Sequence, residues 1–210
     1  MPRPDQSFYL AHFTKNGPQC DLPRENKKPT IEQMTALERL VNILENKKIC
    51  ASKISWVKKD AVCFTECPWG SLLRHVEKYS PYGIGFTKKL LYSRNANPVF
   101  YVNPNIFKSQ KWEDDVYAFL TPFVPWYASE NVKNLEPFNG KPIDYTHERE
   151  WRVTKDFLFT YKNVMFVVLK SVRDLEKIPE NIVKEIGIEK FIFVDTYKKI
   201  EELWPTHRMD

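Results

Sequence analysis

Two glutamates that lie close together in the chain are the first residues whose types and spacing could do chemistry. Glu148 and Glu150 stand in the segment Thr146-His-Glu-Arg-Glu-Trp-Arg152, with Arg149 and Arg152 beside them. Residues two apart in a strand point to the same face, and neighbouring arginines keep a carboxylate ionised at neutral pH. A positioned, ionised carboxylate can stabilise the oxocarbenium-like transition state of glycosidic-bond cleavage. The alternative interpretation is an exposed network of ion pairs, each worth about 0–1 kcal/mol.

A histidine and a threonine near the N-terminus could hold a sugar hydroxyl. His12 and Thr14 come at the end of the alternating apolar segment Phe8 to Phe13. A neutral imidazole and a hydroxyl group can each hydrogen-bond to a ribose. A lone histidine among apolar neighbours is more often a hydrogen-bonded core residue, and both interpretations remain open.

A second pair of polar residues, Thr65 and Glu66, stands at the end of the apolar segment that begins at Ala61. The two residues come just before a turn at Pro68. The Thr65 hydroxyl could fix a ligand or orient a carboxylate, and it could equally cap the end of a strand.

The cysteines and glycines predict no metal site and no phosphate loop. Cys63 and Cys67 lack the second pair, or the His-x-x-x-His, that a zinc site needs. Gly83-Ile-Gly85 is too short for a phosphate-binding loop. These glycines instead predict that a neighbouring group or a ligand approaches the backbone closely.

Hydrophobic periodicity predicts the elements that position these residues. Strands do not alternate regularly with helices, so the pattern favours an α+β fold over a doubly wound sheet. We expect the segment 121–146, rich in Pro, Asn and Gly, to be a long connecting loop with little regular structure. Strands are predicted at 8–13, 49–52, 61–65, 82–86, 99–102, 150–153, 164–169 and 191–194, and helices at 30–44, 69–79, 112–120 and 179–186.

Length and composition indicate one globular domain, residues 1–210. The chain has 42% hydrophobic and 28% charged residues and a net charge of +5, which is compatible with nucleic-acid binding but too weak to establish it. No apolar run approaches the roughly 20 residues of a membrane helix. The first residues lack the apolar segment of a secretory signal, so we expect a soluble cytoplasmic protein with reduced cysteines and no membrane partner.

Taken in order, several short segments resemble the AbiGi-type abortive-infection proteins, small bacterial proteins associated with phage defence. The resemblance runs over residues 8–153, and some proteins of this type are described as antitoxins. The segments are His12-Phe-Thr14, Val62-Cys-Phe-Thr-Glu66, Tyr82-Gly-Ile-Gly-Phe86, Asn97-Pro-Val-Phe-Tyr101 and Glu148-Arg-Glu-Trp-Arg152.

The same layout is similar to the ADP-ribosyltransferase fold, with split mixed and antiparallel sheets and flanking helices. This resemblance implies NAD as a co-substrate and no metal. Glu150 would stabilise the oxocarbenium ion as nicotinamide leaves, and Glu148 would face the acceptor. The middle motif lacks the second Ser of the family's Ser-Thr-Ser form. The residues implied to bind NAD are His12, Phe13 and Thr14 at the ribose, Phe64 and Thr65 in the middle motif, and Tyr79 or Tyr82 against the nicotinamide ring.

These resemblances imply an NAD-dependent ADP-ribosyltransferase, acting as a toxin of a phage-defence system. Its acceptor would be RNA, DNA or protein, and its partner a cognate antitoxin or a chaperone. The alternative is a non-catalytic antitoxin or sensor with the same fold. A third interpretation is a nuclease that holds Mg²⁺ through the glutamates and Asp144 or Glu66. Rings that we expect on the surface, where they could stack on unpaired bases, are Trp56, Trp69, Trp112, Trp126 and Tyr127.

Overall fold

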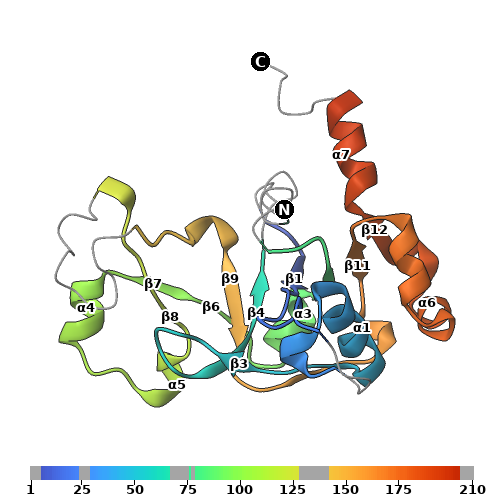
Figure 1. Ribbon diagram of the computed structural model, residues 1–210. Helices are drawn as coiled ribbons and strands as arrows, with labels where there is room; N and C mark the ends of the chain where they lie inside the picture. Colours follow the sequence, from blue (N-terminus) through green and yellow to red (C-terminus); the bar gives the residue numbers. More distant parts are fainter. Residues whose placement is uncertain (1–5, 24–28, 67–75, 77–78, 128–141, 204–210) are drawn as a thin grey trace. The chain divides into compact units, whose positions relative to one another are not determined.

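The chain folds into two compact units whose segments interleave along the sequence (Figure 1). The structure is a computed structural model and describes residues 6–23, 29–66, 76, 79–127 and 142–203. The single domain expected for residues 1–210 stays a prediction. Unit 1 comprises Met1–Lys48, Pro68–Thr87 and Leu158–Asp210, and unit 2 comprises Ile49–Cys67 and Lys88–Phe157.

Unit 1 is built on four described strands and three α-helices. The strands are β1 (Tyr9–Phe13), β5 (Gly83–Thr87), β11 (Phe166–Leu169) and β12 (Phe191–Phe193), and the helices are α1 (Ala36–Asn46), α6 (Glu180–Ile186) and α7 (Val194–Leu203). β5 pairs antiparallel with β1 on one side and with β11 on the other, and β11 runs parallel to β12. All four strands were predicted from periodicity, because their apolar side chains are buried.

Two glycines of β5 allow aromatic rings to approach its backbone. A Cβ added at Gly85 would lie 2.2 Å from the Phe166 ring, and one added at Gly83 would lie 2.8 Å from the Phe13 ring. The predicted close approach is therefore confirmed, and the neighbours are side chains of the protein itself.

Helix α1 begins later than the sequence predicts. Thr30 caps only the 3-10 turn Ile31–Gln33, because Met34 is extended. The α-helix starts after Thr35, whose backbone N–H donates to the Glu38 carboxylate while its hydroxyl accepts from the Glu38 N–H. Two capping boxes follow one another, and the second one sets the helix start.

Unit 2 contains a small antiparallel sheet and a separate parallel pair of strands. Its elements are β3 (Ser52–Lys53), β4 (Asp60–Thr65), α3 (Lys88–Tyr92), β6 (Asn97–Pro98), β7 (Phe100–Val102), α4 (Pro104–Ser109), α5 (Asp114–Tyr117), β8 (Leu120–Pro122) and β9 (Glu150–Val153). β9 lies between β4 and β6, β3 pairs with β4, and β7 runs parallel to β8. Two further short strands, β2 (Lys48–Ile49) and β10 (Phe157–Leu158), span the sequence boundaries between the units.

One prediction for unit 2 is wrong, since the helix expected at 112–120 is reduced to α5 and residues 120–122 form β8. In the described residues of 121–146, regular structure is limited to the end of β8, the bridge between Val124 and Ile143 and the start of a 3-10 helix at Thr146. The helix expected at 69–79 lies largely outside the described residues.

The α+β class is confirmed at the coarse level, with parallel and antiparallel pairings and several helices. Within the described part of the chain, no helix has the length and apolar character needed to cross a membrane.

Candidate functional site

The best-defined polar pair of unit 2 joins Glu150 and Arg152 on β9. Nε and Nη2 of Arg152 donate to Oε1 and Oε2 of Glu150 at 2.8 and 2.9 Å. The Arg152 side chain is fully buried, and that of Glu150 is 12% exposed. Residues two apart in a strand share a face, so the sequence itself brings this acid and base together. Both oxygens of the Glu150 carboxylate are therefore held by one planar guanidinium group.

The remaining donors of Arg152 bind the segment that contains β8. Nη1 donates to the carbonyl oxygens of Ala118 and Leu120 at 2.7 and 3.0 Å, and Nη2 also donates to the Thr121 hydroxyl at 2.7 Å. All five N–H donors of the guanidinium thus have an acceptor inside the protein. The pair consequently fastens β8 to β9.

Glu148 does not share a strand face with Glu150, so the prediction that their spacing places both carboxylates on one face is wrong. Glu148 ends a 3-10 helix (Thr146–Glu148), and Arg149 has a left-handed conformation with φ 45°. The strand alternation therefore begins only at Glu150. Glu148 is buried, and its carbonyl oxygen accepts a hydrogen bond from the Thr65 hydroxyl. Thr65 is itself the register partner of Glu150, so Thr65 connects the ends of β4 and β9.

A second buried carboxylate, Glu66, is also paired. Its Oε1 forms an ion pair with Nζ of Lys88, and its Oε2 accepts from Nε1 of Trp151 at 3.2 Å. The same Lys88 ammonium lies 5.5 Å from the centre of the Trp151 ring. Sequence reasoning did not identify Lys88, because no local pattern connects it to Glu66.

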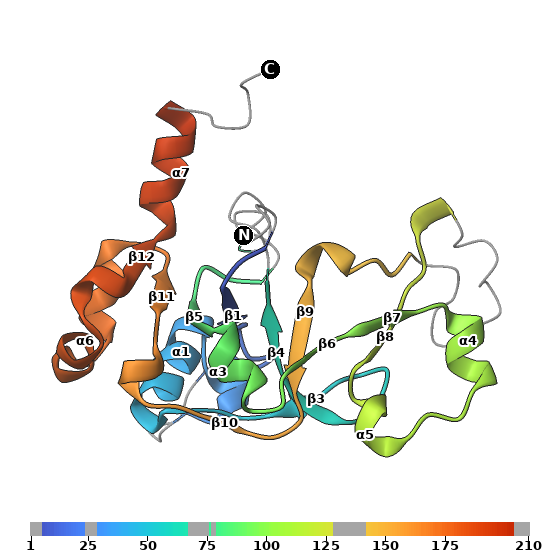
Figure 2. The same ribbon diagram turned by 180° about the vertical axis from the view of Figure 1, so that it is seen from behind.

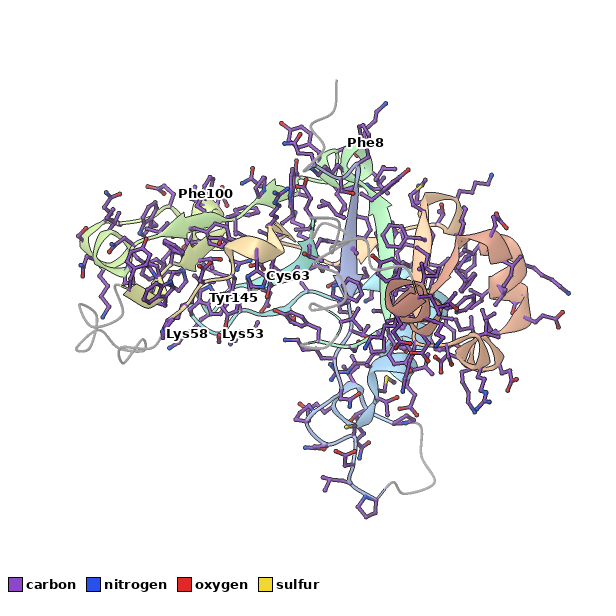
Figure 3. The ribbon with its side chains drawn as sticks, turned by 90° about the horizontal axis from the view of Figure 1, so that it is seen from above. Phe8, Lys53, Lys58, Cys63, Phe100 and Tyr145 are labelled. Atoms are coloured by element: carbon purple, nitrogen blue, oxygen red, sulfur yellow. The ribbon has the colours of Figure 1, made fainter. Side chains whose placement is uncertain are left out.

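Burial keeps the Cys63 thiol and the Tyr101 phenol, which both interact with Glu150, protonated at neutral pH. Cys63 lies on β4 (Figure 3), and its register partner on β9 is Arg152. Burial raises the pKa of its thiol, and the Glu150 carboxylate, to which it donates, raises that pKa further. Burial, with smaller contributions from the Glu150 and Glu148 carboxylates, raises the pKa of Tyr101 to about 12. The Tyr101 hydroxyl donates to the backbone carbonyl of Tyr145 at 2.9 Å. Neither Cys63 nor Tyr101 has the lowered pKa of an activated nucleophile.

The candidate ribose-binding residues lie at the end of β1 in unit 1. Thr14 is buried, and its hydroxyl donates to the carbonyl oxygens of Ala36 and Tyr82 at 2.7 and 3.2 Å. Phe13 belongs to the apolar core of the unit, whereas His12 is half-buried and pairs in register with Ile84. The hydroxyl of Thr14 therefore already binds the backbone of its own unit.

The two candidate tyrosines also have partners within unit 1. Nζ of Lys15 lies 3.9 Å from the centre of the Tyr79 ring. Burial raises the pKa of Tyr82, and the carboxylates of Asp174 and Asp195 raise it further, with a hydrogen bond to Asp174. Stacking of either ring on nicotinamide stays a prediction.

The predicted site residues divide between the units. His12, Phe13, Thr14, Tyr79 and Tyr82 belong to unit 1, and Phe64, Thr65, Glu148 and Glu150 to unit 2. Their assembly into one NAD site stays a prediction. Among the described residues, no group of three or more His, Cys, Asp or Glu side chains is placed to hold a metal ion.

The rings expected on the surface differ in how far they are buried. Trp56 is half-buried, stacks on Tyr145 and donates to the Leu120 carbonyl at 3.2 Å, and Trp112 packs into the same core. The expectation of surface rings is therefore wrong for these two tryptophans. Trp126 and Tyr127 are exposed and pack edge to face. Trp69 lies outside the described residues.

Comparison with known proteins identifies one related family. The family model that matches residues 30–185 is described as "Putative abortive phage resistance protein AbiGi, antitoxin". No curated protein and no solved structure matches the chain. The AbiGi resemblance is thus confirmed, whereas nothing supports the ADP-ribosyltransferase resemblance. Because the description of this family names an antitoxin, the prediction of an ADP-ribosyltransferase toxin is wrong.

Proposed function

The chain belongs to the AbiGi family of abortive phage resistance proteins, and from that premise we propose that it is an antitoxin that binds and restrains a cognate toxin protein. The observation that carries this proposal is the match itself, which covers residues 30–185 and so includes segments of both units. Abortive infection pairs a harmful activity with its restraint, and this chain would supply the restraint.

The geometry of unit 2 supports a binding protein. A catalytic carboxylate must reach the substrate with at least one oxygen. Each oxygen of Glu150 already accepts a hydrogen bond from a buried guanidinium, and each oxygen of Glu66 has a partner. In this arrangement the acidic groups hold strands and helices together, which suits a stable scaffold that presents its outer surface to a partner.

The test is co-expression of the full chain with the product of the neighbouring gene. We expect the neighbouring product to arrest growth when expressed alone, and this chain to relieve the arrest and to co-purify with it. Growth arrest by this chain alone, or the lack of any stable complex, would contradict the proposal.

A second measurement separates restraint from catalysis. Glu150→Gln keeps the side-chain shape but leaves the buried Arg152 without its anion, so circular dichroism first establishes that the variant is folded. The folded variant should neutralise the toxin as the parent does. NAD labelled in the adenylate moiety should stay intact with both proteins. NAD turnover that disappears in Glu150→Gln would support the catalytic roles predicted for Glu150 and Glu148.

A further inference from the structure

The positive net charge of the chain comes from one continuous part of unit 2. The segment 88–112 contains five basic and no acidic residues, whereas the rest of the chain contains 27 of each. This segment forms α3, β6, β7 and α4, and all of it belongs to unit 2. The net charge of +5, which is modest for the whole chain, is therefore concentrated on four consecutive elements. The basic residues are Lys88, Lys89, Arg94, Lys108 and Lys111.

Three of these five cations are exposed and have no ion-pair partner within the described part of the chain. Of the other two, Lys88 is paired with the buried Glu66, and Lys111 is followed closely by the acidic residues 113–115. Cations that no carboxylate neutralises raise the local concentration of anions at the protein surface. The three are Lys89, Arg94 and Lys108.

Two aromatic rings are exposed on the same elements. Tyr92, at the end of α3, is 70% exposed, and Phe100, at the start of β7, is 48% exposed. Tyr92 lies three residues after Lys89 on α3, so their side chains are neighbours. β6 leads from α3 to β7 (Figure 2), and Phe100 and α3 lie along the same margin of unit 2 in the view from above (Figure 3). We call Lys89, Tyr92, Arg94, Phe100 and Lys108 together the basic surface.

Exposed rings among unpaired cations are typical of a surface that binds single-stranded nucleic acid. Such surfaces bind phosphates through lysine and arginine and stack unpaired bases on aromatic rings. A protein partner fits less well, because lysine is depleted at protein–protein interfaces, whereas protein–DNA interfaces are much more positively charged. The exposed amides of Asn95 and Asn105 add groups that can hydrogen-bond to base edges.

We propose that the basic surface binds a single strand of DNA or RNA. Bases stack on Tyr92 and Phe100, and phosphates bind to Lys89, Arg94 and Lys108 as the strand passes from α3 over β7 to α4. Contacts of this kind tolerate any base sequence, because every base has a π face and every nucleotide has a phosphate. The proposal is independent of the antitoxin proposal, since oligonucleotide binding is measured without a toxin.

The test is fluorescence anisotropy of labelled oligothymidylate and oligouridylate, each of about 12 nucleotides, titrated with the full chain. We expect binding that weakens steeply between about 50 and 200 mM salt. Tyr92→Ala should raise the dissociation constant at least about fivefold, because a stacked base is lost. Tyr92→Phe keeps the ring and should bind as the parent does. Circular dichroism checks that each variant is folded.

The cations are tested through the salt dependence of binding. In Lys89→Gln, and likewise in Arg94→Gln, the slope of the logarithm of affinity against the logarithm of salt concentration should fall by about 0.7, the value for one lost contact with a single strand. Lys53→Gln is the matched control, because Lys53 is an exposed lysine of the same unit that lies on the margin opposite Phe100 in Figure 3. It should leave the slope unchanged.

Several results would overturn the proposal. These are a parent that binds neither oligonucleotide at about 50 mM salt, a Tyr92→Ala variant that binds as tightly as the parent, and a Lys53→Gln variant as impaired as Lys89→Gln. Polyglutamate has charges but no bases, so its competing as strongly as an unlabelled oligonucleotide would exclude stacking. A toxin complex that is lost in Arg94→Gln, with no oligonucleotide bound by the parent, would assign the basic surface to the toxin. A preference for oligothymidylate or for oligouridylate supports the proposal and identifies the strand as DNA or RNA.

Discussion

At the scale of single residues, the neighbours of a carboxylate determine its role. Glu150 looks like a catalytic group when it is considered with Glu148, but in the structure it is paired with Arg152. The rule that residues two apart share a strand face holds for Glu150 and Arg152, because both lie within β9. It fails for Glu148, because Arg149 has a left-handed conformation that no sequence pattern announced.

Replacing Arg152 with Met should strongly destabilise the protein. The change leaves the Glu150 carboxylate nearly buried without its cation, and breaking such a pair costs about 3–5 kcal/mol. Urea denaturation of the full chain measures the loss in free energy of unfolding. The control is Arg94→Met, since Arg94 is an exposed arginine of the same unit, and we expect a change of at most about 0.5 kcal/mol.

The double variant Glu150→Leu with Arg152→Met separates charge from packing. It removes both buried charges at once, so it should be more stable than Arg152→Met alone. A single variant Arg152→Met no less stable than Arg94→Met would show that the pair does not fasten β8 to β9.

Cys63 should react more slowly with iodoacetamide than Cys50 does. The thiolate is the reactive species, and burial together with the Glu150 carboxylate raises the pKa of Cys63. Cys50 is exposed and free. Mass spectrometry of alkylated peptides over time gives both rates in one sample. Equal rates would mean that the Cys63 thiol is neither buried nor hydrogen-bonded as described.

At the scale of elements, the sequence predicts the regular strands well and the short helices poorly. Hydrophobic periodicity predicts strands such as β4 and β11, because most of their residues are buried and a regular apolar pattern reflects burial. Pro122 argues against a strand at 120–122, but β8 is an edge strand of a two-stranded sheet, where proline is tolerated. The sequence pattern does not predict α7, because its few apolar residues are separated by charged ones.

Replacing Gly85 with Ala should destabilise unit 1 by about 1–3 kcal/mol, because the added Cβ would overlap the Phe166 ring. Urea denaturation gives the change in free energy of unfolding. In Phe166→Leu the ring is gone, so Gly85→Ala should cost less in that background. Equal costs in both backgrounds would exclude the ring as the cause.

At the scale of the whole molecule, the family was easier to predict than the function. The order of short motifs along the chain indicated AbiGi, and the match confirms it. The chemistry inferred from the same motifs required the polar groups of Thr14 and Glu150 to face a ligand. The hydrogen bond of Thr14 to Ala36 joins residues 22 apart, and only the folded chain reveals it. The Glu150–Arg152 pair joins residues of one strand, and its burial against β8 is what the sequence does not show.

The stability of the whole chain should fall at alkaline pH, because buried or half-buried phenols occur in both units. Burial and nearby carboxylates raise the pKa of Tyr82 and of Tyr161, and raise that of Tyr101 to about 12. Phenols of the unfolded chain titrate near about pH 10. Above that pH the unfolded chain binds fewer protons than the folded one, so the free energy of unfolding decreases as pH rises.

The contribution of Tyr101 is fully present below about pH 10 and is lost as pH rises through about 12. Urea denaturation at a series of pH values measures this slope. Tyr101→Phe removes the titrating group, so its free energy of unfolding should decrease less steeply in this window. Tyr92→Phe is the matched control, because Tyr92 is 70% exposed in the same unit and should leave the slope unchanged. If Tyr101→Phe and the parent decline in parallel, the Tyr101 hydroxyl is solvated and its hydrogen bond to the Tyr145 carbonyl does not form.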